Sequence, residues 1–108
     1  MNWINLTPHR IEIKLVNGRT KVIPATGIVA RVVSTEEDIT VIDGIRITKQ
    51  VSKIINLPKP IKGTMYIVSR VVAKEAMIMG RNDILIPAEQ SKHPATGQIN
   101  RCNGLSVV

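Results

Sequence analysis

The sequence predicts an α+β fold in which strands dominate and one short helix is added. Ile and Val together supply 29 of the 108 residues, whereas Leu supplies five and Phe none, and β-branched side chains favour strands over helices. Asn17-Gly18 and Asp43-Gly44 each separate two strand-like runs, which is the strongest short-range signal for a β-hairpin. We therefore expect mostly antiparallel hairpins in a compact sheet or barrel-like core, folded as a single domain over residues 1–108.

The first hairpin is predicted over residues 10–23, where apolar and polar residues alternate on the N-terminal side of Asn17-Gly18. The turn residues 24–27 then interrupt the chain. Residues 28–33 form an almost continuous apolar run, which predicts a central strand with both faces covered.

A second hairpin is predicted from residues 39–42 and 45–49, after a polar stretch, residues 34–38, that holds three carboxylates. The strand over residues 45–49 alternates, so one of its faces should contact solvent. Residues 57–63 contain two prolines and should connect this hairpin to a strand over residues 64–68, because proline removes a backbone donor.

One helix is predicted over residues 70–79, with Ser69 as its N-cap and Gly80 at its end. Val72, Ala76 and Met79 should share its buried side. Residues 84–87 should form a strand, residues 89–97 a long loop, and the last short strand should lie within residues 98–107.

The net charge of +7, from 15 Lys and Arg against eight Asp and Glu, favours a phosphate-bearing partner. Residues 44–81 alone carry eight basic residues and one acid, Glu75. A nucleic-acid partner is disfavoured because Trp3 and Tyr66 are the only aromatic residues available for base stacking, and no helix-turn-helix pattern is present. The alternative is that the basic residues form a solvated face that protects strand edges from aggregation.

An enzymatic or metal-dependent activity is not expected. Cys102 is the single cysteine, and His9 and His93 stand without a metal-ligand spacing. Neither standard phosphate-binding glycine loop occurs. Cys102 as a nucleophile would need a histidine folded beside it, and the alternative is a buried apolar thiol. We expect no cofactor, and, since neither a signal sequence nor an 18-residue apolar run is present, a cytoplasmic protein with no membrane partner.

Several arginines adjoin turns or element ends, where a planar guanidinium could bind phosphate. Arg70 follows the predicted cap Ser69, so an anion there would meet free amides, the helix dipole and a guanidinium. Residues 24–31 and 94–101 share the pattern Pro-Ala-Thr-Gly-x-x-x-Arg, ending at Arg31 and Arg101. Each copy could expose amides and an arginine to an anion. The alternatives are surface ion pairs and two similar turns.

The segment Asn5-Leu6-Thr7-Pro8-His9 is dense in hydrogen-bonding groups. Asn and Thr before proline could simply form a bend in which His9 bonds to the main chain. Alternatively, Asn5, Thr7 and His9 could bind a base edge or ribose hydroxyls.

This segment belongs to a recognisable set of motifs. With residues 23–31, 66–69, 81–83 and 101–105, it resembles a family of short phage, prophage and bacterial proteins that share the Asn-Leu-Thr-Pro-His signature. Small phage proteins of this size include sponges that sequester host nucleotide immune signals without cleaving them, usually in pockets that a homo-oligomer completes.

The resemblance implies a non-catalytic sponge for a cyclic ADP-ribose isomer or a cyclic oligonucleotide, with arginines on phosphates and Asn5, Asp83 or His9 on base and ribose. The implied ligand-binding residues are Asn5, Thr7, His9, Arg31, Ser69, Arg70, Arg81, Asp83 and Arg101. The main alternative is a virion or assembly accessory protein with no small-molecule ligand. A third alternative is a phosphodiesterase acting on the same nucleotides.

Overall fold

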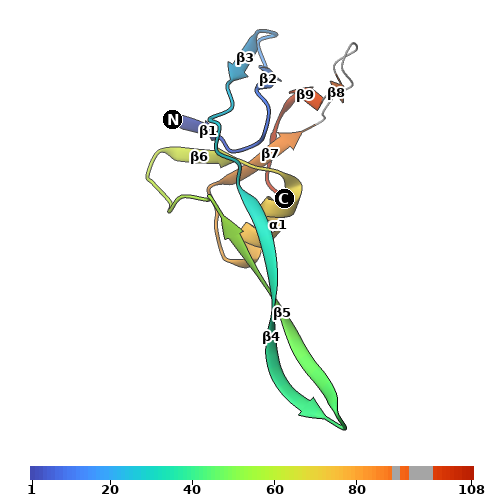
Figure 1. Ribbon diagram of the computed structural model, residues 1–108. Helices are drawn as coiled ribbons and strands as arrows, with labels where there is room; N and C mark the ends of the chain where they lie inside the picture. The colour runs from blue at the N-terminus through green and yellow to red at the C-terminus, as the bar shows by residue number, and fades with distance from the viewer. Residues whose placement is uncertain (89–90, 93–98) are drawn as a thin grey trace.

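The computed structural model describes residues 1–88, 91–92 and 99–108, which form ten strands and one helix (Figure 1). The elements are β1 (Asn2–Asn5), β2 (Ile11–Lys14), β3 (Thr20–Ile23), β4 (Arg31–Ile42), β5 (Ile45–Ile55), β6 (Thr64–Ile67), α1 (Arg70–Ile78), β7 (Ile84–Ala88), β8 (Ser91–Lys92), β9 (Ile99–Cys102) and β10 (Gly104–Ser106). The predicted α+β class with dominant strands is confirmed.

The body of the molecule has three layers, in which α1 and a sheet of order β3-β2-β9-β8 lie on opposite faces of a central sheet of order β1-β6-β7-β10 (Figure 1). Strand β6 connects the two hydrophobic cores because its side chains alternate between faces. Tyr66 packs in the core beneath α1, with Val72 and Ala76 of the helix. Ile67 packs in the other core, with Ile11 and Ile13 of β2.

The prediction of mostly antiparallel hairpins in a compact sheet or barrel-like core is confirmed only in part: four of the described strand pairs are antiparallel. Three strand pairs are parallel, namely β1 with β6, β6 with β7, and β2 with β9, and none of the three sheets closes into a barrel. The paired strands are far apart in sequence, so long connections, including α1, allow them to align in the same direction. Tight turns determine the antiparallel pairing only of strands that follow each other directly in the sequence.

The first predicted hairpin is confirmed, since β2 and β3 pair antiparallel with Ile11 opposite Ile23. The second is also confirmed around its turn. Asp43 and Gly44 have φ angles of 53° and 76°, which is the two-residue geometry that joins twisted strands most readily and that Asp-Gly pairs favour.

The predicted central strand over residues 28–33 is wrong. Residues 28–30 lie outside any strand, and β4 begins at Arg31 and continues through the polar stretch 34–38 to Ile42. Together β4 and β5 form a long two-stranded arm that projects from the body (Figure 1). The arm accounts for the extents of 63 × 37 × 23 Å and for a radius of gyration of 17.5 Å, compared with about 13 Å for a compact chain of this length.

Most of the remaining elements agree with the sequence prediction, but the one short strand expected within residues 98–107 is two strands, β9 and β10. Residues 57–63 connect β5 to β6 without forming a strand. The helix begins after Ser69 and ends before Gly80, which has a φ of 82°. Met79 is 60% exposed, so it does not share the buried face of Val72 and Ala76. Of the predicted loop 89–97, residues 91–92 form β8, and the others lie outside the described residues.

Candidate functional site

A groove of about 530 Å³ lies where three distant segments meet at the base of the arm. The segment after β1 contributes Thr7, the start of the arm contributes Arg31, and the start of α1 contributes Ser69. Aliphatic side chains form most of the remaining wall, namely Leu6, Val29, Val32, Val33, Val71 and Val72, with Pro8 and Ala30 completing it. Three of the nine predicted site residues therefore share one groove.

Asn5 holds the first segment in place from beneath. It is fully buried, and its Nδ2 donates to the carbonyl oxygens of His9 at 2.8 Å and Ile23 at 3.2 Å. Its Oδ1 accepts from the backbone N–H of Thr7 at 2.9 Å and from the Thr7 hydroxyl. Because both ends of the amide are engaged and shielded from water, Asn5 positions the groove and does not face a ligand.

The Pro24–Gly27 turn is fastened to the same residue. The Thr26 hydroxyl lies 3.1 Å from the backbone oxygen of Asn5, to which it donates, and Asn5 and Ala25 form an isolated parallel bridge. The segment Asn5–His9 and the Pro24–Gly27 turn are therefore two sides of one junction. This junction directs the chain from β3 to Arg31, so its first role is structural.

The start of α1 supplies the third wall. The Ser69 side chain accepts a hydrogen bond from the backbone N–H of Val72 at 3.5 Å, which confirms the predicted N-cap. No acidic residue lies in the first helical turn. The positive end of the helix dipole is therefore not neutralised locally, and it faces the same region as the exposed Arg70.

The arginines divide into paired and unpaired residues. Arg10, Arg46, Arg81 and Arg101 each form an ion pair. Within the part of the chain that the structure describes, Arg31 has no hydrogen-bond or ionic partner, and the same is true of the Arg70 side chain. The Arg31 side chain is therefore unpaired in the groove wall, whereas the unpaired Arg70 is not a lining residue but lies in sequence between two lining residues, Ser69 and Val71.

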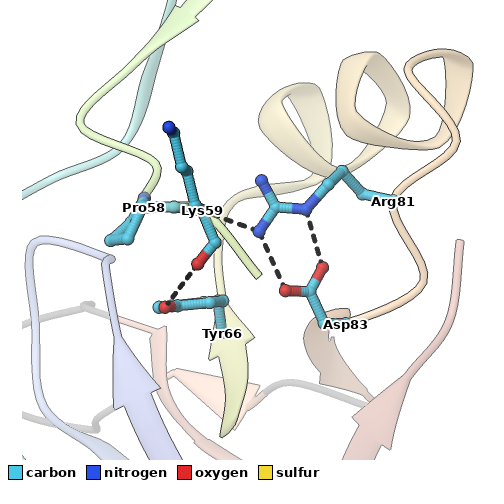
Figure 2. A network of polar contacts seen from close by, with 5 residues as sticks. All are labelled: Pro58, Lys59, Tyr66, Arg81 and Asp83. Carbon is cyan, nitrogen blue, oxygen red and sulfur yellow. Dashed lines mark hydrogen bonds and ion pairs between the residues drawn. The ribbon is translucent and has the colours of Figure 1, made fainter. Parts of the chain in front are cut away.

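Arg81 and Asp83 are not part of this groove but form an internal clamp (Figure 2). Arg81 Nε and Nη2 donate to the two carboxylate oxygens of Asp83 at 2.9 and 2.8 Å, and Nη2 also donates to the Pro58 oxygen at 2.9 Å. The guanidinium carbon lies 5.9 Å from the centre of the buried Tyr66 ring, whose hydroxyl donates to the Lys59 oxygen at 3.3 Å.

The clamp holds the connector 57–63 against β6. The hydrogen bonds from Arg81 lower the pKa of Asp83, and those bonds also raise the pKa of Arg81, in each case against an opposing effect of burial. Both side chains are about nine-tenths shielded, with relative exposures of 12% and 10%. Arg81 and Asp83 therefore have a structural role in the described chain, and their predicted ligand roles stay predictions.

Arg101 also lies outside the groove. It is directly opposite Glu12 in the pairing of β9 with β2, and its Nε donates to Glu12 Oε2 at 3.0 Å. Arg10 contacts the other oxygen of Glu12 at 3.3 Å. The turn 94–97 that precedes Arg101 in the repeated motif lies outside the described residues, so only the two arginines can be compared: Arg31 lines the groove, and Arg101 does not.

Among the described residues, His9 and Cys102 are the two candidate reactive groups. His9 is exposed at the surface, and His93 lies outside the described residues. Cys102 is buried, and burial raises the pKa of its thiol because it disfavours the thiolate. Among the described residues, no group of three or more His, Cys, Asp and Glu side chains could hold a metal ion, and no helix has the length and hydropathy needed to cross a bilayer.

Sequence reasoning missed the apolar walls of the groove and the full length of the arm. The walls come from residues that are ordinary core candidates until the junction at Asn5 brings them together. A signal for the arm was available, because residues 31–55 contain no proline, and the Asp43-Gly44 turn lies at their centre. No protein-family model, curated protein or solved structure matches this chain. The likeness to the Asn-Leu-Thr-Pro-His proteins therefore stays a prediction from the motifs.

Proposed function

We propose that this chain is a non-catalytic binding protein of phage type that sequesters a small phosphate-bearing nucleotide signal and so blocks host anti-phage defence. The observation that carries the proposal is the groove at the base of the arm, beside which Arg31 and Arg70 have no ionic partner among the described residues. Guanidinium groups without ionic partners, close to a helix N-terminus that has no acidic residue in its first turn, favour phosphate.

The size and lining of the groove suit such a ligand. A volume of about 530 Å³ lies within the range of small-molecule sites, which combine apolar walls with a few polar groups. The aliphatic side chains of Leu6, Val29 and Val71 would contact the base, while the Thr7 and Ser69 hydroxyls would bond to ribose or phosphate. A cyclic ADP-ribose isomer or a cyclic oligonucleotide is the proposed ligand class.

A thermal-shift screen tests this function. Purified protein is heated with cyclic ADP-ribose isomers, cyclic dinucleotides, cyclic trinucleotides, NAD and short oligonucleotides, and each hit is recovered after heating to check that the ligand is intact. A ligand at about 100 times its Kd should stabilise the fold by about 2.7 kcal/mol, which raises the Tm by about 10 °C or more in a domain of this size.

The variants separate this groove from the other arginine sites. Arg31→Gln and Arg70→Gln should each reduce the shift by at least half, whereas Arg101→Gln, which removes an exposed arginine outside the groove, should preserve it. The proposal fails if no nucleotide raises the Tm, or if Arg31→Gln binds as well as the natural protein. Release of a converted product would instead support a phosphodiesterase.

The projecting arm favours a second candidate function, that of a virion or assembly accessory protein. Long exposed strands are common sites of association between chains, and β4 and β5 extend well beyond the body (Figure 1). Native mass spectrometry of the purified protein, together with analysis of phage particles, would support this function if it detects large rings or particle-bound protein. A nucleotide-binding dimer would exclude it.

A further inference from the structure

One face of the arm carries most of its exposed aliphatic side chains, and beyond its base, where Arg31 and Val33 line the groove, no part of the described chain covers it. Residues that lie opposite each other in an antiparallel pair share a face, and the faces alternate along each strand. A bulge at Ile39 shifts the β4 pairing between Asp38 and Thr40. The register therefore defines an apolar face made of Arg31, Val33, Thr35, Glu37, Thr40 and Ile42 of β4 with Ile45, Ile47, Lys49, Val51, Lys53 and Ile55 of β5.

The opposite face is either attached to the body or polar, which supports this assignment. At its base, Val32 and Ile54 both pack against the core beneath α1. Further out, the hydroxyl oxygens of Ser34 and Ser52 lie 3.2 Å apart, and Asp38 pairs with Arg46. Among the paired residues beyond the core contacts, Val41 is the one large aliphatic residue on this opposite face, and Ile39, in the bulge, has no partner in the register.

The apolar face needs a partner on physical grounds. Ile42 and Ile45 at the tip are 57% and 63% exposed, and they lie on the projecting part of a two-stranded ribbon, where no other strand or helix of the described chain supports it (Figure 1). Two-stranded hairpins without such support are marginally stable in water. Contiguous exposed apolar surface on a monomer usually marks an interaction site.

Charge identifies the partner as a second copy of this chain. The outer half of the arm, residues 36–50 by register, contains four of the eight acidic residues and two basic residues, Arg46 and Lys49, and so carries a net charge of −2. The inner half of the apolar face carries Arg31 and Lys53, with Lys49 near its middle. A ribbon that is acidic at its tip and basic at its base is complementary to a copy of itself running in the opposite direction.

We propose that two copies associate by packing the apolar faces of their arms together in antiparallel orientation, so that each tip rests on the base of the other arm. Ile42 and Ile45 then contact the partner's Ile55, Glu37 lies near the partner's Lys49, and Asp43 at the tip lies near the partner's Lys53. This association does not rest on the proposed nucleotide site. Because Arg31 belongs to both surfaces, the tests below leave it unchanged.

Sedimentation velocity measures the association directly. At about 50 µM the natural protein should sediment as a species of twice the 11.9 kDa chain mass. Ile42→Thr combined with Ile45→Thr keeps the strand propensity but removes apolar surface, and should raise the dimer Kd at least 10-fold. Val41→Thr is the matched control, because Val41 is 65% exposed at the same tip but on the opposite face, and it should leave the dimer intact.

Cysteine pairs test the orientation. Ile42 is opposite Ile45, ten residues of β5 away from Ile55, or about 33 Å at roughly 3.3 Å per residue, far beyond the reach of a disulfide. Under mild oxidation, the Ile42→Cys, Ile55→Cys double variant should therefore form a covalent dimer. Ile42→Cys alone should stay uncrosslinked, as should the natural protein, whose Cys102 is buried.

Four results would overturn the proposal. The first two are a natural protein that is monomeric at 50 µM and an assembly larger than a dimer. The third is a Val41→Thr variant that weakens the dimer as much as the Ile42→Thr, Ile45→Thr double variant does. The fourth is efficient crosslinking of Ile42→Cys alone, which would mean that the two tips meet. Circular dichroism of each variant checks that the body remains folded, and all three tip residues are more than half exposed.

Discussion

The carboxylate of Asp83 is held by two hydrogen bonds from one guanidinium, in a position where water reaches only a tenth of the side chain. Bidentate pairing of this kind has a specific geometry and is stronger than bonding between neutral groups. Removing one member leaves the other charged, shielded and unpaired, which costs more free energy than the pair contributes. Arg81 also donates to the Pro58 oxygen. A change in the position of the Arg81 side chain should therefore disturb mainly the connector 57–63.

Asp83→Asn should lower the free energy of unfolding by about 2–4 kcal/mol, because it leaves the Arg81 charge without a counterion. Asp38→Asn is the matched control, since the Asp38–Arg46 pair is well exposed and should change stability by less than about 1 kcal/mol. Urea unfolding at pH 7 measures both values. Equal effects of the two substitutions would contradict a structural role for the clamp.

The same pair predicts a pH dependence with a definite sign. The pKa of Asp83 is lowered in the folded state by its bonds to Arg81. Its contribution is therefore complete above the unfolded pKa of about 3.9 and is lost as the pH falls through the folded pKa. The stability difference between the natural protein and Asp83→Asn should stay constant from pH 8 to pH 5 and narrow below about pH 4.

At the level of elements, α1 connects the stability of the fold to the candidate site through a single cap. Ser69→Ala removes the hydrogen bond to the Val72 amide and should lower the free energy of unfolding by about 1 kcal/mol. Ser69→Asp retains a capping oxygen and places a negative charge at the positive end of the helix. The free energy of unfolding of Ser69→Asp should be close to that of the natural protein. The nucleotide-induced Tm shift should be lost, because the new carboxylate repels phosphate.

Chemical denaturation and the thermal-shift screen separate the two effects of Ser69. Ser52→Ala, which removes an exposed hydroxyl on the arm, should change neither stability nor the nucleotide shift appreciably. If Ser69→Asp retained the full nucleotide-induced shift, the ligand would not lie at the start of α1.

The elements that could be predicted from sequence are those that local chemistry specifies. Asp43-Gly44 adopts the positive φ angles that a tight hairpin needs, and Ser69 and Gly80 mark the limits of α1. Parallel pairing, such as that of β1 with β6, depends on contacts between residues more than 60 positions apart and leaves no local signal.

The candidate site was predicted less completely for the same reason. Turn chemistry indicated that Thr7, Arg31 and Ser69 flank element ends, and the structure brings these three together. In the structure, by contrast, Arg81 is paired with Asp83, and Arg101 is paired with Glu12. Sequence alone could not separate a paired arginine from an unpaired one, because that depends on which acid the fold places beside it.

For the whole molecule, the arm makes the shape much longer than the core requires. The body holds both hydrophobic clusters, while the outer arm contributes exposed aliphatic side chains such as Ile42 and Ile45. If the arms of two copies cover each other, folding and association are coupled, and the Tm depends on protein concentration by mass action. The natural protein should then melt several degrees higher at about 100 µM than at about 1 µM.

The doubly substituted Ile42→Thr, Ile45→Thr protein should melt at a temperature independent of concentration over the same range, whereas Val41→Thr should keep the concentration dependence. Differential scanning fluorimetry with matched dye and buffer measures all three proteins. Because an intramolecular role for the arm would make every one of these Tm values independent of concentration, the natural protein alone decides whether the arm acts within one chain or between two. The two variants then decide which face of the arm is responsible.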